Sequence, residues 1–168
     1  MSRPKIMITG YSRHGKGTLA SGFLEAGWKC KDSSYASAEI FLFDALKGEL
    51  GYRTVQECWQ DRHNHRARWY EMISGYNASD NCRLMRGIYE HNDVYVGIRS
   101  RQELLTGLDQ RLVDLVIWVE RPSYAAESHQ SMNIRKGDSD IVVYNTGEVG
   151  DLRRKGHRLA RLLDGDHK

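Results

Sequence analysis

A glycine-rich segment near the start of the chain has the spacing of a phosphate-binding loop. The segment, Gly10-Tyr-Ser-Arg-His-Gly15-Lys16-Gly17-Thr18, fits the pattern G-x-x-x-x-G-K. Glycines let backbone N–H groups surround a polyphosphate, and a lysine at this spacing reaches the β- and γ-phosphate oxygens. The residues expected to contact a nucleotide are Gly10, Ser12, Arg13, His14, Gly15, Lys16, Gly17 and Thr18.

The end of this loop departs from the commonest form of the motif. Gly17 occupies the position at which a serine or threonine usually binds Mg²⁺, and Thr18 follows one residue later. The GKGT ending resembles that of nucleoside monophosphate kinases such as adenylate kinase. This resemblance implies ATP and Mg²⁺ as cofactors, with Thr18 on an ATP phosphate and Mg²⁺ held through waters and a carboxylate. Asp32 is the candidate for that carboxylate.

Three further charged residues follow predicted strands, where the ligands of parallel sheets bind. Asp32 ends a second apolar run, and its carboxylate can accept a proton or hold Mg²⁺ through water. Its alternative role is to cap the helix that begins near Tyr35. Arg99 and Arg101 follow the third run and can clamp an anion, although they also fit an exposed pair at a helix start. The catalytic candidates are therefore Lys16, Asp32, Arg99 and Arg101.

A basic and aromatic segment at 61–70 is the candidate substrate-binding region. On one continuous helix, Arg62, Arg66 and Trp69 share a face, so the arginines can meet phosphates and the ring can stack on a base. Tyr76 follows and is expected at the edge of the same pocket. The alternative is a solvated helix face with Trp69 in the core, and for that residue the core is favoured. The substrate-binding candidates are Asp32, Arg62, Arg66, Trp69, Tyr76, Arg99 and Arg101.

The elements that must position these residues alternate between strand and helix. Short apolar runs rich in β-branched residues indicate strands, and capping-box patterns at Thr54 and Ser100 indicate helix starts. The predicted strands are 6–9, 28–31, 94–98, 115–119 and 141–144, and the flanking predicted helices are 18–26 and 148–163. This order predicts an α/β, three-layer P-loop kinase fold with a parallel sheet and a helical insertion at about 54–91.

Length and composition fit one ordinary globular domain spanning 1–168. The chain is 40% hydrophobic and 28% charged, with a net charge of +3, so neither disorder nor an obligatory polyanion partner is indicated. Three cysteines without a CxxC pair favour a reducing compartment over a disulfide or zinc framework. No apolar run is long enough to cross a membrane, and no signal peptide is visible. The expected location is the cytoplasm, that of the host cell if the protein is viral.

Two segments have a less specific composition. Residues 121–139 form a short, polar, lid-like loop in which Arg121 or Arg135 could reach ATP phosphates. The basic run of the last helix includes Arg153 and Arg161, and a solvated face is favoured over a nucleic-acid surface there.

Six stretches together resemble a known group of enzymes. They are the GKGT loop, SAEIFLFDALK, ECWQDRHNHRARWYEMISGYN, YVGIRSRQE, LVIWV and DIVVYNTG. They are similar to bacteriophage P-loop kinases related to thymidylate and other deoxynucleoside monophosphate kinases, and most similar to phage 5-hydroxymethyluracil DNA kinases. The resemblance implies ATP-dependent phosphorylation of the 5-hydroxymethyl group of 5-hydroxymethyluracil in phage DNA, a step toward thymidine hypermodification.

Two other functions stay open at this point. One is a soluble kinase that makes deoxynucleoside diphosphates from free monophosphates; the other is a non-catalytic, nucleotide-dependent DNA-binding protein. The expected partner is accordingly DNA containing 5-hydroxymethyluracil or a free deoxynucleoside monophosphate, with no membrane partner. The oligomeric state is not predicted.

Overall fold

A five-stranded parallel sheet forms the centre of the molecule. The computed structural model describes residues 2–128 and 132–165. The sheet has the strand order β2-β3-β1-β4-β5, and every pairing is parallel. Its strands are β1 (Ile6–Thr9), β2 (Cys30–Asp32), β3 (Val94–Val96), β4 (Leu115–Glu120) and β5 (Ile141–Tyr144). The predicted α/β fold with a parallel sheet is confirmed.

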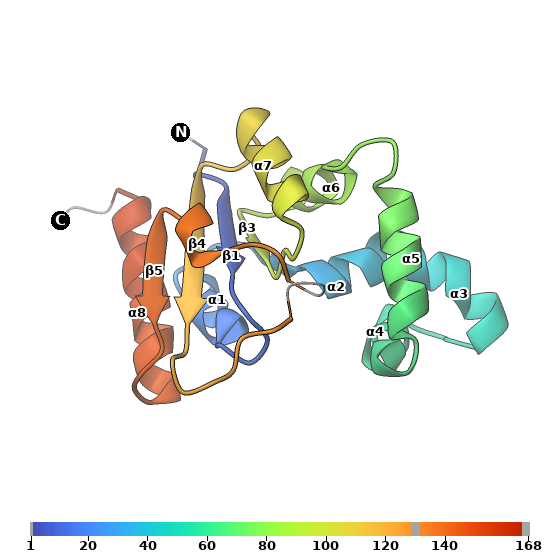
Figure 1. Ribbon diagram of the computed structural model, residues 1–168, viewed down its shortest axis with the longest axis horizontal. Helices are drawn as coiled ribbons and strands as arrows, with labels where there is room; N and C mark the ends of the chain where they lie inside the picture. Colours follow the sequence, from blue (N-terminus) through green and yellow to red (C-terminus); the bar gives the residue numbers. More distant parts are fainter. Residues whose placement is uncertain (1, 129–131, 166–168) are drawn as a thin grey trace.

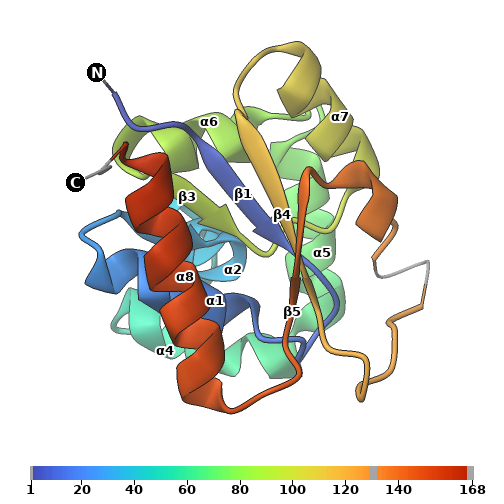
Figure 2. The ribbon, with the colours of Figure 1, turned by 90° about the vertical axis from the view of Figure 1, so that its left-hand side faces the viewer.

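Helices cover both faces of this sheet (Figures 1 and 2). Helices α1 (Lys16–Glu25) and α8 (Val149–Leu163) pack on one face, and α6 (Arg83–His91) and α7 (Arg101–Asp109) pack on the other. Side chains alternate along β1 to serve both faces: Ile6 and Ile8 belong to the core under α1 and α8, and Met7 to the core under α6 and α7. The sheet is therefore buried on both sides, as its continuous apolar runs predict.

Helices α1 and α8 approach each other unusually closely. A side chain on Gly22 would meet the backbone oxygen of Arg153 at 2.1 Å, and one on Gly156 would meet the backbone oxygen of Leu19 at 2.1 Å. The glycines are needed here because any Cβ would collide with the opposite backbone. The helix that begins at the phosphate loop is thus fixed against α8.

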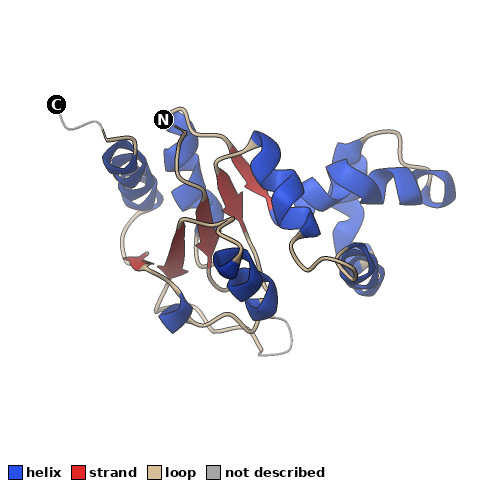
Figure 3. Cartoon of the chain, turned by 90° about the horizontal axis from the view of Figure 1, so that it is seen from above, coloured by secondary structure: helices blue, strands red, loops and turns tan. Residues whose placement is uncertain are grey.

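A group of helices extends from one side of the sheet (Figures 1 and 3). All of it lies between β2 and β3. The elements are α2 (Ser33–Ser37), a π-helical turn (Ala38–Leu42), α3 (Phe43–Leu50), α4 (Val55–Asp61), a 3₁₀ turn (Arg62–Asn64), α5 (Arg66–Tyr76) and α6. The part of this group from the π-helical turn to α5 is called here the helical lobe. It has a core of its own around Leu42, Leu46, Cys58 and Trp69.

The helices between β2 and β3 extend beyond the predicted insertion at 54–91. The helices between β2 and β3 begin at Ser33, directly after the Asp32 cap, and continue through the π-helical turn into α3. The predicted capping box at Thr54 is confirmed, since Thr54 and Glu57 exchange side-chain and backbone hydrogen bonds. The segment 61–70 is not one continuous helix, because a 3₁₀ turn at Arg62–Asn64 precedes α5, which begins at Arg66.

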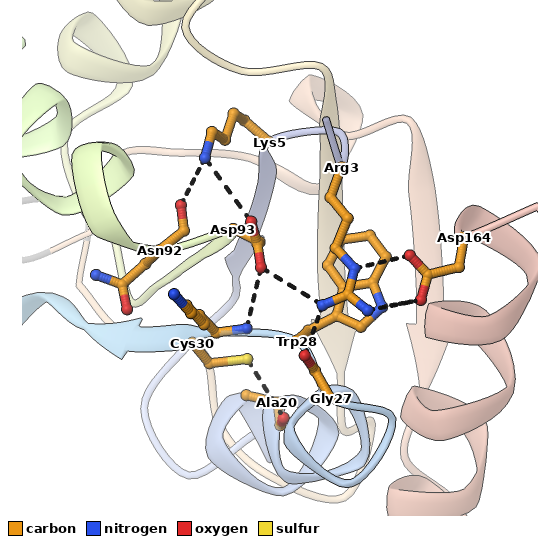
Figure 4. Close-up of polar contacts among 10 residues, drawn as sticks. Arg3, Lys5, Ala20, Gly27, Trp28, Cys30, Asn92, Asp93 and Asp164 are labelled. Carbon is orange, nitrogen blue, oxygen red and sulfur yellow. Dashed lines mark hydrogen bonds and ion pairs between the residues drawn. The ribbon is translucent and has the colours of Figure 1, made fainter. Parts of the chain in front are cut away.

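A polar network lies at the amino ends of the strands, opposite the strand ends that carry the charged candidates (Figure 4). Arg3 donates to both carboxylate oxygens of Asp164 at 2.8 and 3.0 Å, and Trp28 Nε1 donates to the same carboxylate at 3.1 Å. Asp93 accepts from the backbone N–H of Lys29 at 3.1 Å. The network joins the chain before β1 to the end of α8 and to the chain before β2.

Among the described residues, no helix is both long and apolar enough to cross a membrane.

Candidate active site

The glycine-rich motif lies between the central strand and a helix, the context in which such motifs bind phosphate in other proteins. The loop follows β1, and Gly15 adopts a left-handed conformation, with φ 104°, immediately before α1 begins at Lys16. The ammonium of Lys16 folds back over the loop and donates to the carbonyl oxygens of Gly10 and Tyr11 at 2.8 and 2.7 Å. The pKa of Lys16 is lowered to about 8, chiefly by burial and to a smaller extent by the nearby Arg99 cation.

The loop forms the floor of a cleft of about 370 Å³, called here the phosphate cleft. Its lining includes Asp32 at the end of β2, Val96 at the end of β3, Arg121 after β4 and Asn145 after β5, so the ends of all five strands converge on it. The loop residues in that lining are Arg13, Gly15, Lys16, Gly17 and Thr18. Arg121 is the cation of the 121–139 loop that reaches this cleft, whereas Arg135 lines a different hollow.

His14 is part of the loop's framework. Its ring is 1% exposed, accepts from the backbone N–H of Arg121 at 3.0 Å and lies 3.2 Å from the carbonyl oxygen of Ala125. The backbone oxygen of His14 accepts from Asn145 at 3.1 Å. The side chain therefore ties the phosphate loop to the 121–125 segment and does not line the phosphate cleft.

A carboxylate of the lid-like loop contacts the phosphate loop. Glu127 accepts from the backbone N–H of Ser12 at 2.6 Å and from Arg99 at 2.7 Å. Burial raises the pKa of Glu127, but the hydrogen bonds from Arg99 and Ser12 outweigh it and leave the pKa below its ordinary value. One loop amide and one arginine thus hold an anionic group beside Lys16. Residues 129–131 of the predicted lid lie outside the described residues.

Asp32 caps a helix, as one of its two expected roles requires, and it also lines the phosphate cleft. Its Oδ1 caps α2, accepting from the backbone N–H groups of Ser34 and Tyr35 at 2.9 and 3.2 Å. Within the described chain, Oδ2 makes no hydrogen bond and the residue lines the phosphate cleft. Gly97 (φ 96°) lies beside it; a side chain there would approach Oδ2 to 3.5 Å. One oxygen thus fixes the carboxylate to α2, and the other is left without a hydrogen bond within the described residues.

A second, larger cleft of about 940 Å³ lies beside the first and is called here the acceptor cleft. It lies between the helical lobe and the end of β3. Its charged lining comprises Arg66 from α5, Arg99 after β3 and Glu103 from α7. Its polar lining includes Ser33, Ser34, Ser37, Asn77, Asn81 and Ser100. Ser34 connects the two clefts because its hydroxyl donates to Asp32 and accepts from Trp59 Nε1 at 2.9 Å.

The two arginines after β3 are separated. Arg99 lines the acceptor cleft, with a side chain 50% exposed. Arg101 lines a different hollow and forms an ion pair with Asp138 at 2.9 Å. The expectation that Arg99 and Arg101 clamp one anion therefore fails, because Arg99 pairs with Glu127 and Arg101 pairs with Asp138 in different hollows.

The predicted basic stripe at 62–69 is also broken. Arg66 reaches the acceptor cleft, but Arg62 sits in the 3₁₀ turn with its guanidinium 4.2 Å from the centre of the Trp59 ring. Trp69 is 5% exposed in the core of the helical lobe, so the core position favoured for it is confirmed, and its place among the substrate-binding candidates is corrected. Tyr76 stacks on Phe41 at 4.2 Å and lies under Arg83, outside the lining of the acceptor cleft.

Sequence reasoning missed Glu103 and Glu127. Neither glutamate belongs to a motif that predicts a site: Glu103 lines the acceptor cleft from α7, and Glu127 contacts the phosphate loop from the 121–128 segment. The Ser100 to Glu103 capping pattern did locate Glu103 at the start of a helix, and Ser100 Oγ accepts from the Glu103 N–H at 3.3 Å.

The residues present fit a nucleotide polyphosphate. The Lys16 ammonium forms no ion pair with a carboxylate in the described part of the chain, and the loop already binds the Glu127 carboxylate through Ser12. No group of three or more potential metal ligands occurs in residues 2–128 and 132–165. A Mg²⁺ ion would therefore be held by Asp32 and the polyphosphate, and it would supply charge neutralisation for phosphoryl transfer.

Comparisons with known proteins show the fold. The sequence matches no protein-family model, and no curated protein matches it significantly. A crystal structure of TT1252 from Thermus thermophilus superposes with a TM-score of 0.53 and 19% identity, covering 99% of this chain and 100% of that one. Dephospho-CoA kinase from Campylobacter jejuni superposes with a TM-score of 0.54 and 13% identity, covering 96% and 98%. The chain thus has the α/β fold found in P-loop kinases.

Proposed function

We propose that the protein is an ATP-dependent phosphotransferase. The observation that carries the proposal is the adjacency of two clefts at the carboxyl ends of parallel strands, one with the phosphate loop and Lys16, the other with Arg66 and Arg99. Asp32 lies where they meet, linked through Ser34 to the acceptor side. The similarity in fold to dephospho-CoA kinase supports this class of reaction.

The acceptor we propose is the 5-hydroxymethyl group of 5-hydroxymethyluracil in DNA. A hydroxyl acceptor must lose a proton as its oxygen bonds to phosphorus, and a carboxylate in reach promotes that loss. Asp32 Oδ2 has no hydrogen bond within the described residues and is suited to take the proton. As the new bond forms, the bond from the γ-phosphorus to ADP breaks, and Lys16 neutralises charge on the phosphates.

Free deoxynucleoside monophosphates are the second candidate acceptors. An acceptor phosphate is already ionised and needs cations, and Arg66 and Arg99 both line the acceptor cleft. The basic run of α8 does not distinguish the candidates. Arg153 pairs with Glu25 at 3.2 Å, Arg154 pairs with Asp151, and α8 lies at the far side of the sheet from α5 (Figure 1).

One labelling experiment tests the proposal. The protein, Mg²⁺ and γ-labelled ATP are incubated with duplex DNA containing 5-hydroxymethyluracil, with thymine-only DNA, and with mixed deoxynucleoside monophosphates. Label on the modified base alone supports the DNA kinase. Label in nucleoside diphosphate replaces it with the second candidate. If no arm gives a labelled product, neither kinase function is supported. ATP binding, measured by thermal shift, would then favour the nucleotide-dependent DNA-binding protein.

A further inference from the structure

A buried acid in the acceptor cleft has no role in the chemistry described above. Glu103, in the first turn of α7, is 9% exposed, yet it lines the acceptor cleft together with Tyr95, Asn77 and Asn81. Carboxyl groups are rarely buried unless a cation or several donors compensate them. A buried Glu103 carboxylate therefore needs hydrogen-bond donors or a nearby cation.

The protein supplies little of that compensation. Oε1 accepts one long hydrogen bond, 3.3 Å, from the hydroxyl of Tyr95, and Oε2 has no hydrogen bond within the described residues. Among the described residues, Trp69 Nε1 is the only fully buried side-chain N or O atom without a hydrogen bond. Oε2 of Glu103 is therefore not fully buried, and it is accessible from the cleft that Glu103 lines. Glu103 forms no ion pair in residues 2–128 and 132–165, although Arg99 lines the same cleft.

The titratable groups that face Glu103 are neutral near pH 7. They are Tyr95 on β3, Tyr89 on α6 and Cys82 before α6; burial raises the pKa of all three, and the Glu103 charge raises it further. Burial raises the pKa of Glu103 itself to about 7, and the Tyr95 hydrogen bond only partly opposes this. The carboxyl group is thus able to gain or lose a proton near neutral pH, depending on what occupies the cleft.

The arrangement gives the cleft two chemically different sides. Arg66 and Arg99 offer hydrogen-bond donors and positive charge, whereas an ionised Glu103 offers only acceptors. A ligand that satisfies both has an anionic group on one side and an N–H donor on the other. A nucleotide whose base carries an imide N–H, such as a uracil or thymine nucleotide, has this pattern.

We propose that Glu103 is a specificity-determining residue for the acceptor: its carboxylate accepts a hydrogen bond from the imide N–H of a uracil-type base. Cytosine presents a lone pair at the same ring position, so it opposes the carboxylate and is disfavoured. This inference rests on the proposed function for the identity of the cleft, and it applies to a base in DNA or in a free nucleotide.

The test compares two acceptors in two variants. Oligonucleotides containing either 5-hydroxymethyluracil or 5-hydroxymethylcytosine are phosphorylated by the wild type and by Glu103→Gln. Glutamine offers both a donor and an acceptor, so the preference for the uracil base, as a ratio of kcat/KM values, should fall by about tenfold or more. The change should lie in the acceptor KM, with the KM for ATP unaltered. Glu49→Gln, which removes an exposed carboxylate paired with Arg68, is the matched control.

The pH dependence provides a readout that a merely structural role would not give. In the wild type the KM for the uracil acceptor should fall as pH rises through about 7, because the ionised carboxylate is the form that accepts the N–H. In Glu103→Gln this dependence should disappear. If Glu103→Gln does not fold, Tyr95→Phe removes the hydroxyl that holds Glu103 and should weaken the same preference.

The outcomes separate this inference from the proposed function. If the wild type phosphorylates only free nucleotides, the same ratio is measured with dTMP and dCMP. If it phosphorylates nothing, the proposed function fails, and equilibrium binding of dTMP and dCMP to both variants still decides the role of Glu103. An unchanged preference in Glu103→Gln, by turnover or by binding, overturns the inference.

Discussion

The phosphate cleft and the acceptor cleft adjoin each other but are built in different ways. The phosphate cleft depends chiefly on one continuous segment, residues 10–18, whose backbone wraps between β1 and α1. The acceptor cleft is assembled from side chains of α2, α5, α6, α7 and the end of β3. The first is a property of backbone conformation, and the second is a property of how distant segments pack. Substitutions should therefore act locally and severely in the first, and selectively in the second.

The largest effect is expected at Lys16. Lys16→Ala removes the ammonium that reaches the transferred phosphate, so transfer should fall by about 10³-fold or more. Steady-state kinetics with labelled ATP measures the loss, and circular dichroism checks that the fold persists. Substantial turnover in this variant would show that the phosphate cleft does not bind the transferred phosphate.

Asp32, at the boundary of the two clefts, should behave as a catalytic group. Asp32→Asn keeps an oxygen that caps α2, so stability should change little. It removes the proton acceptor, so kcat should fall by roughly 10²–10⁴-fold while the ATP dissociation constant stays constant. Calorimetric ATP titration and single-turnover kinetics measure the two quantities. A normal kcat would show that the acceptor needs no base, which favours a phosphate acceptor.

Arg66 and Arg101 distinguish the acceptor cleft from the surface beside it. Arg66→Ala should raise the acceptor KM by about 10–100-fold, because it removes a charged hydrogen-bond donor from the cleft. Arg101→Ala is the matched control: its guanidinium pairs with Asp138 in another hollow, so both KM values should stay unchanged. Equal effects in both variants would show that the acceptor extends over both hollows.

The smallest effect is a pH-dependent gain in stability. Burial raises the pKa of Glu103 to about 7 from 4.5, so the folded protein binds more protons than the unfolded chain between these values. The contribution of Glu103 to stability is therefore lost as pH rises from about 4.5 to 7. Glu103→Gln should be more stable than the wild type at pH 8, by on the order of 1–3 kcal/mol, with a difference that shrinks toward pH 5. Urea unfolding at both pH values measures it.

The contrast between the clefts also explains what the sequence can predict. The loop at 10–18, the strands and the Thr54 capping box follow from local patterns, and the structure has them. Whether Trp69 faces a ligand or a core depends on how α5 packs against α3 and α4, which no local pattern specifies. The separation of Arg99 from Arg101 depends on where Glu127 and Asp138 return from distant parts of the chain.

The contact between Gly22 and Gly156 has a consequence for how the protein is made. Helix α1, which carries the phosphate loop, packs backbone to backbone with α8, a helix synthesised after all five strands. A contact so distant along the chain forms late, since a long loop must close before it is gained. On the ribosome, α1 would thus emerge with its α8-facing side uncovered and wait for most of the translation time. During this interval the apolar side of α1 lacks its partner helix, and the nascent chain is then most exposed to aggregation and proteolysis.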